Sequence, residues 1–365
     1  MIANKVASVS DVSLGYACPQ IPNLQVFLMQ EVGASEGLVL EPDQSERPIQ
    51  HDLFKEFKTV RVYTEQPPWC NQWMIEYNKL CAERLNAFEP DVLVIYQPHL
   101  FPVLSMLNKR PRCVIFYQLE MPEYYKYKDL YEQYHQRLAE YVDIVLFPEE
   151  NRRIAYMKEY GLQGVKSAVL YNAPVLREGS TQKIKRNERI IYTGTIDKGL
   201  TFSEFYTCKD SQQFPIDIFG AFSKADRNDL EKQYGELYQN VRYMGYVSAD
   251  VLANVRKEYA YGLVSWNPIS DNYLYAAPNK FFEYIQDGVV PIAAPHPQCK
   301  QIIERYNCGI LMKDWTYESF VRAICYAMDI YGSPLYASMV KNCARAYKDE
   351  LNWQVQTEKI KQFLI

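Results

Sequence analysis

The sequence has no long hydrophobic run, no excess of one charge and no close pair of cysteines, and each absence excludes a class of protein. No apolar segment approaches the length of about 20 residues that a membrane-spanning helix needs. The 40 basic and 44 acidic side chains nearly balance, which argues against a nucleic-acid partner. Nine scattered cysteines without a Cys-x-x-Cys pair favour a reducing compartment and argue against a zinc site. With no signal-peptide pattern at the start, we expect a cytoplasmic protein.

Two cofactor motifs are also missing. No Gly-x-Gly-x-x-Gly follows any predicted strand, which disfavours a dinucleotide-dependent oxidoreductase. No Asp-x-Asp that could hold a divalent ion follows a predicted strand either. The length of 365 residues suggests two domains.

The most informative stretch covers residues 257–295. An apolar strand is predicted from Tyr261 to Trp266, followed by a polar loop and a helix from Ala277 that Gly288 ends. A second apolar strand then follows from Val289 to Ala294. This order is typical of a doubly wound α/β sheet, in which ligands bind beyond the carboxyl ends of the strands. A ligand site is therefore expected at the start of the helix.

The start of that helix carries residues suited to a nucleotide. Backbone N–H groups near Pro278 and Asn279, together with the helix dipole, favour phosphate there. Lys280 could neutralise phosphate charge, and the Glu283 carboxylate could accept two hydrogen bonds from a ribose diol. The alternative is that Lys280 and Glu283 form a surface i,i+3 ion pair without any binding function.

This stretch resembles the nucleotide-binding signature of the retaining GT-B glycosyltransferases called group 1 or family four. Their pattern is Pro-x-Lys-apolar-apolar-Glu-Tyr, then Gly and an apolar strand containing Pro. The matching residues here are Pro278, Lys280, Phe281, Phe282, Glu283, Tyr284, Gly288 and Pro291. The resemblance implies that Glu283 binds the ribose of a donor nucleotide. An acidic residue is common in the family eight positions earlier, where this chain has Tyr275.

Two further passages resemble the same family. Residues 190–200 are similar to its strand followed by Gly-Arg-x-x-x-Lys-Gly, which implies that Gly194 admits the diphosphate and Lys198 neutralises it. The arginine of the pattern is Thr195 here, so one of the two expected cations is missing. Residues 240–248 resemble the passage beside the nucleotide base, which implies base contacts from Tyr246 and Val247.

The first half of the chain matches the family only in outline. Its alternating strands and helices predict a parallel Rossmann-like sheet: strands at 6–9, 26–29, 91–96 and 113–117, a helix at 71–88 and a polar excursion at 33–50. Many family members have a cleft histidine at the end of the last of these strands, where this chain has Tyr117 or Gln118, so Tyr117 is a catalytic candidate by its position. Glu120 in the following loop, or His99 after the preceding strand, could line the site instead. The alternative for both is a structural or surface role.

The resemblance implies an α/β GT-B fold with two Rossmann-like domains facing a central cleft and a last helix that crosses back to the first domain. We place the domains at 1–175 (acceptor), 176–349 (donor) and 350–365 (returning helix). The implied reaction moves a sugar from a nucleoside-diphosphate sugar to a saccharide or lipid-linked saccharide acceptor with retention, in surface polysaccharide synthesis. The resemblance also implies that the reaction uses no metal and no resident cofactor. The tyrosine-rich residues 121–137 could be an acceptor surface, a membrane contact at the inner face, or an ordinary amphipathic helix. The main alternative is a GT-B scaffold without catalysis, and a nucleotide-sugar epimerase is a further one.

Overall fold

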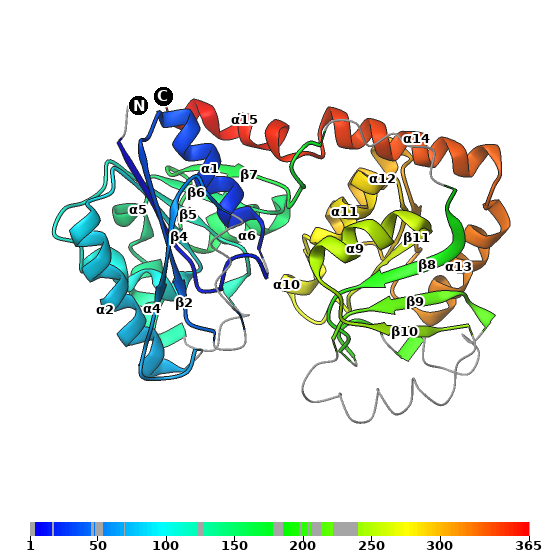
Figure 1. Cartoon of the computed structure of the whole chain (residues 1–365), viewed down its shortest axis with the longest axis horizontal. Helices are drawn as coiled ribbons and strands as arrows, with labels where there is room; N and C mark the ends of the chain where they lie inside the picture. Colours follow the sequence, from blue (N-terminus) through cyan, green and yellow to red (C-terminus); the bar gives the residue numbers. More distant parts are fainter. Residues whose placement is uncertain are drawn as a thin grey trace. The chain divides into compact units, whose positions relative to one another are not determined.

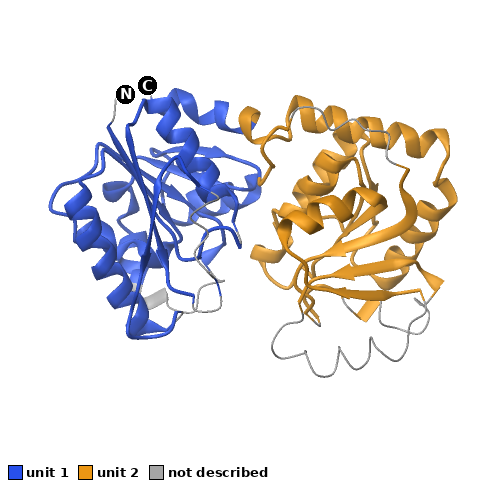
Figure 2. Ribbon diagram, viewed as in Figure 1, with its two compact units in different colours: residues 1–171, 356–365 blue, residues 172–355 orange. Residues whose placement is uncertain are grey.

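The structure is a computed structural model (Figure 1). It describes residues 4–16, 18–44, 47, 54–68, 70–122, 128–177, 185–197, 199–202, 204–205, 213–221 and 240–364, with side chains of 128–130 left out. They form two compact units: unit 1 comprises residues 1–171 and 356–365, and unit 2 comprises residues 172–355 (Figure 2). In the described part of the chain, no helix combines the length and the hydropathy that a membrane crossing requires.

Unit 1 is built on a parallel sheet of seven strands in the order β3-β2-β1-β4-β5-β6-β7. The strands are β1 (Lys5–Val9), β2 (Glu36–Pro42), β3 (Lys58–Val62), β4 (Val92–Tyr96), β5 (Cys113–Tyr117), β6 (Ile144–Phe147) and β7 (Lys166–Val169). The helices are α1 (Gln20–Val32), α2 (Asn71–Phe88), η2 (Pro98–Leu100), α3 (Pro102–Ser105), α4 (Lys128–His135), α5 (Leu138–Tyr141) and α6 (Glu150–Glu159). Strands β4 and β5 are buried along their whole length, as expected for a sheet covered on both faces.

Two predictions for this unit were wrong. Residues 26–29, predicted as a strand, lie inside α1, because Ile21, Leu24 and Leu28 recur at helical spacing and are fully buried. The polar excursion at 33–50 contains β2, whose buried run Leu38–Leu40 is too short to stand out among polar neighbours. In both segments the apolar run is too short to distinguish the period of a helix from that of a strand.

Unit 2 is built on a second parallel sheet, of six strands in the order β10-β9-β8-β11-β12-β13. The strands are β8 (Asn187–Thr193), β9 (Ile216–Phe219), β10 (Arg242–Gly245), β11 (Tyr259–Val264), β12 (Val290–Ala293) and β13 (Ile310–Leu311). The helices are α9 (Ala249–Val255), η5 (Arg256–Glu258), α10 (Asp271–Leu274), α11 (Asn279–Asp287), α12 (Pro297–Tyr306), α13 (Tyr317–Ile330), α14 (Pro334–Asp349) and α15 (Trp353–Leu364). The predicted α/β class with two parallel sheets is confirmed.

Helix α11 is fixed against the sheet by Tyr284. A Cβ on Gly262 of β11 would lie 2.4 Å from the Tyr284 ring, so only glycine leaves room for this packing. The buried Tyr284 hydroxyl lies 3.2 Å from the Thr193 hydroxyl and donates to the Ile191 carbonyl of β8 at 3.2 Å. The helix starts at Asn279, two residues later than predicted, because Pro278 takes the N-cap position with an extended backbone.

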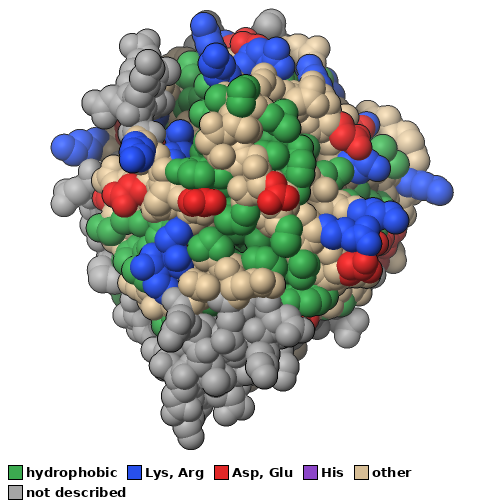
Figure 3. Space-filling view, turned by 90° about the vertical axis from the view of Figure 1, so that its right-hand side faces the viewer, with side chains coloured by type: hydrophobic (Ala, Val, Ile, Leu, Met, Phe, Trp, Pro, Cys, Tyr) green, Lys and Arg blue, Asp and Glu red, His purple; other side chains and the backbone are tan. Residues whose placement is uncertain are grey.

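Helix α15 begins in unit 2 and continues, from Gln356, in unit 1. Its first residue donates its backbone N–H to the Pro174 carbonyl in unit 2 at 2.9 Å. Farther along, Lys361 pairs with Glu31 of α1 at 3.5 Å. On the face shown in Figure 3, basic and acidic side chains are interspersed with apolar ones.

Candidate functional site

Glycines end three neighbouring strands at the carboxyl edge of the unit 2 sheet. Gly194, Gly220 and Gly245 follow or close β8, β9 and β10, and all three have positive φ, at 124°, 156° and 77°. A Cβ on Gly220 would lie 1.7 Å from the Gly194 carbonyl oxygen, so this close approach requires glycine. At these three positions the backbone of the sheet edge therefore carries no side chain that would cover it.

The amino end of α11 lies on the chain between β11 and β12, as the sequence predicts. Its N-cap, Pro278, makes no side-chain capping hydrogen bond. The Asn172 side chain donates to the Ala277 carbonyl at 2.7 Å and so holds the turn before the helix. An uncapped first turn carries the positive end of the helix dipole and suits an anion.

Lys280, the second residue of α11, is buried rather than on the surface. Its ammonium lies 3.8 Å from the ring centroid of Tyr192 and 4.6 Å from that of Trp266. It also lies against Gly194, since a Cβ there would be 3.1 Å from Lys280 Nζ. Burial lowers the pKa of Lys280 to about 7, although the nearby Glu283 charge acts in the opposite direction.

Glu283 pairs with an arginine instead of Lys280. Arg256 Nη1 donates to Glu283 Oε2 at 2.8 Å, and Arg256 Nε donates to Asp287 Oδ2 at 2.6 Å. Arg256 and Asp287 side chains are 6% and 4% exposed, whereas that of Glu283 is 33% exposed. The surface Lys280–Glu283 pair is thus not formed, and Glu283 has a structural partner in addition to any ligand.

The other predicted nucleotide-binding residues are spread along the same edge. Thr195 is exposed and its carbonyl accepts the Tyr192 hydroxyl at 2.7 Å. Tyr246 follows β10 and is 73% exposed, and Val247 is half-buried. Lys198 lies outside the described residues. The structure therefore brings Lys280 into contact with Gly194, next to Thr195.

His296, which the sequence reasoning did not single out, orders this edge. It follows β12, and its Nε2 accepts the Trp266 backbone N–H at 3.2 Å while its Nδ1 lies 3.2 Å from the Leu274 carbonyl. Burial lowers the pKa of His296 to about 4, so the ring is neutral and Nδ1 carries the proton. Its position directly after a buried strand was the available signal.

In unit 1, His99 and Asp11 meet at the carboxyl ends of β4 and β1. His99 Nε2 lies 3.3 Å from Asp11 Oδ2, and both side chains are buried. Asp11 Oδ1 is buried with no hydrogen-bond partner in the described part of the chain. The sequence reasoning selected His99 and missed Asp11, because the spacing along the chain does not show their contact.

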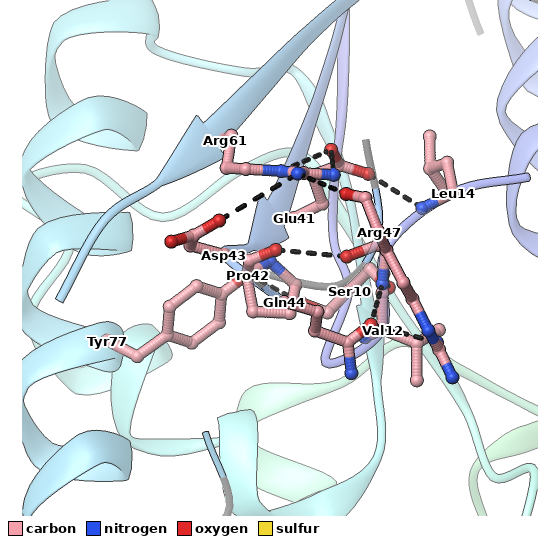
Figure 4. A network of polar contacts seen from close by, with 11 residues as sticks. Ser10, Val12, Leu14, Glu41, Pro42, Asp43, Gln44, Arg47, Arg61 and Tyr77 are labelled. Atoms are coloured by element: carbon pink, nitrogen blue, oxygen red, sulfur yellow. Dashed lines mark hydrogen bonds and ion pairs between the residues drawn. The ribbon is translucent and has the colours of Figure 1, made fainter. Parts of the chain in front are cut away.

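The loop that carries Asp11 is held by side chains of β2 and α2 (Figure 4). Glu41 Oε2 accepts the Leu14 N–H at 2.6 Å, while Oε1 accepts Arg61 Nη2 at 2.8 Å. The Tyr77 hydroxyl donates to the Ser10 carbonyl at 2.6 Å. These buried contacts fix the loop before any ligand binds.

The other two catalytic candidates differ in their surroundings. Tyr117 is fully buried and its hydroxyl donates to the Leu170 carbonyl at 3.1 Å; burial raises its pKa. This geometry gives Tyr117 a structural contact and no support for catalysis. Glu120 follows β5, is 36% exposed in its side chain, and lies 3.3 Å from Nη1 of the buried Arg152. Glu120 is therefore an accessible carboxylate held by a neighbouring cation.

No model of a known protein family matches the chain, and no curated protein matches it in sequence. Solved structures do match in fold. HepE from Anabaena, solved in complex with UDP and glucose, is 11% identical, with a TM-score of 0.71 over 99% of both chains. WaaG, a glycosyltransferase involved in lipopolysaccharide biosynthesis, is 12% identical, with a TM-score of 0.70 over 98% of this chain and 99% of its own.

Sucrose-phosphate synthase from Thermosynechococcus elongatus is similar to the same degree, with 14% identity and a TM-score of 0.70 over 99% of this chain and 98% of its own. These likenesses cover essentially the whole chain, and they show that it has the GT-B fold of glycosyltransferases.

Proposed function

We propose that the protein is a glycosyltransferase that moves a sugar from a nucleoside-diphosphate sugar to a saccharide or lipid-linked saccharide acceptor with retention of configuration. The observation that carries the proposal is the carboxyl edge of the unit 2 sheet. There, Gly194 leaves the backbone uncovered and the uncapped amino end of α11 adjoins it in the fold, with a buried cation, Lys280, in contact with Gly194. An anion with a sugar attached suits such an edge.

The fold neighbours support a nucleotide sugar as the ligand. HepE has been solved with UDP and with UDP-glucose. In the proposed reaction the bond between the sugar and the diphosphate breaks, and the charge left on the diphosphate is stabilised by the α11 amino end and Lys280. The diphosphate can itself accept the acceptor proton, so the reaction needs no resident metal or cofactor and no enzymic base.

Glu283 is the proposed ribose contact. One oxygen, Oε2, is held by Arg256, which fixes the carboxylate without consuming Oε1. Residues Pro278, Asn279, Thr195, Tyr246 and Val247 complete the proposed nucleotide edge. For the acceptor side we propose the strand ends of unit 1, with Glu120 and the His99–Asp11 pair as the polar groups that recognise hydroxyls.

We place the protein in surface polysaccharide synthesis in the cytoplasm, with peripheral contact at the inner face of the membrane as part of the proposal. A non-catalytic scaffold is the second candidate, favoured by Thr195 and Tyr275 where the family pattern has an arginine and an acid. The two candidates differ in turnover. A transferase hydrolyses its donor slowly without acceptor, and a scaffold shows no hydrolysis above background.

The first test is a thermal-shift panel with UDP, GDP, ADP, CMP and NAD. A ligand at about one hundred times its Kd adds roughly 2.7 kcal/mol to the free energy of unfolding, which raises Tm by several degrees. We expect one nucleoside diphosphate to give this shift. The Glu283→Gln variant should lose about one to two powers of ten in affinity. Glu304→Gln, an exposed glutamate on α12, is the matched control. No shift with any of the five would contradict the proposal.

A further inference from the structure

Among the described residues of unit 2, Lys280 differs from the other buried cation, Arg256, in having no carboxylate bonded to it. Arg256 is bonded to two carboxylates, Glu283 and Asp287. Among the described residues, no carboxylate or carbonyl oxygen is bonded to the Lys280 ammonium. A buried charge without a partner costs folding free energy, so its presence requires a reason other than stability.

The ammonium is instead held by two aromatic faces. The Tyr192 ring comes from β8 and the Trp266 ring follows β11, so the fold itself sets the two walls of the cage. The His296 contact to the Trp266 backbone and the edge-to-face contact of their rings at 6.1 Å fix the second wall. Aromatic faces attract a cation without neutralising it, which leaves the charge available for an anion.

Few titratable groups surround this lysine. Glu283 and Tyr284 lie on its own helix, Tyr192 faces it from β8, and Asp197 in the loop after β8 acts on Tyr192. The pKa values of Tyr192 and Tyr284 are raised by burial, so both remain neutral. From the end of β11, the uncharged Trp266 ring faces the ammonium. Among the described residues, Glu283 is thus the carboxylate that acts on Lys280, and it is bonded to Arg256.

We propose that Lys280 takes the place of the arginine missing at Thr195: its caged ammonium binds the diphosphate of the donor, and it takes up a proton when this anion binds. This inference rests on the proposed function. It follows from the contact between Lys280 and Gly194, which puts the ammonium at the uncovered backbone after β8. In the free protein near neutral pH, burial leaves only part of the Lys280 population charged. A neighbouring diphosphate favours the charged form.

The test is calorimetric titration of the whole chain with UDP-glucose, GDP-glucose and ADP-glucose. Their diphosphate diesters stay fully ionised above about pH 6, so the ligand itself takes up no proton. Titrations at about pH 8 in two buffers of different ionisation enthalpy give the number of protons bound. We expect roughly one proton taken up per ligand, and a Kd that rises up to about tenfold per pH unit above pH 7.

Two substitutions of Lys280 distinguish the effect of a positive charge on ligand binding from the uptake of a proton. Lys280→Arg keeps a permanent charge, so its binding should show no proton uptake. Lys280→Met should bind about ten- to a hundredfold more weakly than the unchanged protein. Lys300→Met, on the exposed face of α12, is the matched control and should change neither quantity.

The outcomes distinguish this inference from the function that it rests on. If a nucleotide sugar binds without proton uptake and Lys280→Met binds equally well, the inference is overturned and the donor site stands. If none of the three binds, both fail. Because the proton count is measured on the unchanged protein, the test does not depend on whether a variant folds.

Discussion

Two parts of unit 2 hold buried charge in opposite ways. In one part, Arg256 bridges Glu283 and Asp287, and Asp217 accepts hydrogen bonds from Arg189 and Arg242. At the carboxyl edge, Lys280 is buried between two rings, and no acid in the described part of the chain is bonded to it. The paired charges connect elements of the fold, because each joins residues from different strands and helices. The lone cation connects nothing, and this difference marks the carboxyl edge as the place where a ligand supplies the missing charge.

The largest effect that this comparison predicts comes from Arg256. Arg256→Met leaves the buried Asp287 carboxylate without its partner. We expect a loss of about 3–5 kcal/mol in the free energy of unfolding, measured by urea denaturation. Arg322→Met removes a pair in which both side chains are at least 70% exposed, and it should cost about 0.5 kcal/mol or less. Equal effects of the two substitutions would break the distinction between structural and surface pairs.

Asp217 gives a smaller effect with a defined pH dependence. Burial alone would raise its pKa, but hydrogen bonds from Arg242, Arg189 and Tyr259 outweigh burial and hold the pKa below its usual value. The stabilisation is thus complete above the unfolded pKa of about 4 and is lost as pH falls through the folded pKa. Asp217→Asn should cost about 2–3 kcal/mol at about pH 7.

The difference between Asp217→Asn and the unchanged protein should then shrink below about pH 4. Urea denaturation at several pH values would measure it. A difference that stays constant as the solution is acidified would show that the hydrogen-bond geometry, and not the charge, stabilises this cluster.

Lys280→Met should change stability in the opposite direction. The folded pKa of about 7 lies below the ordinary value of 10.5 for lysine, so the folded state disfavours the charged form. The cost is complete below pH 7 and disappears as pH rises toward 10.5. We expect the variant to unfold a few degrees higher than the unchanged protein at about pH 6 and equally at about pH 10. A variant that is less stable at both values would show that Lys280 is a structural residue.

At the carboxyl edge of the unit 2 sheet, the sequence predicted the strands and helices better than the contacts between their side chains. Apolar runs predict the two strands on either side of α11, and Pro278 and Gly288 mark the start and end of the helix. These signals lie within the segment itself and need no knowledge of its partners in the fold. The burial of Lys280 does not follow from its i,i+3 spacing to Glu283, because the two rings that enclose it come from β8 and the end of β11. Spacing along one helix carries no information about partners on other strands.

The same limit applies to the other contacts that the sequence did not show. Asp11 and His99 are far apart in the chain and meet because β1 and β4 are neighbours in the sheet. His296 orders Trp266 through a backbone hydrogen bond, which has no sequence pattern. In unit 1, α1 was mistaken for a strand at 26–29 because a four-residue apolar run fits either period.

The most direct measurement is the pKa of Lys280 itself, followed by NMR on protein labelled at the lysine side chains, with Lys280→Arg to assign the signal. The account predicts a pKa near 7 in the free protein and a value at least about two units higher with a bound nucleotide sugar. An ordinary value of about 10.5 in both states would contradict it, because Lys280 would then be a solvated surface cation.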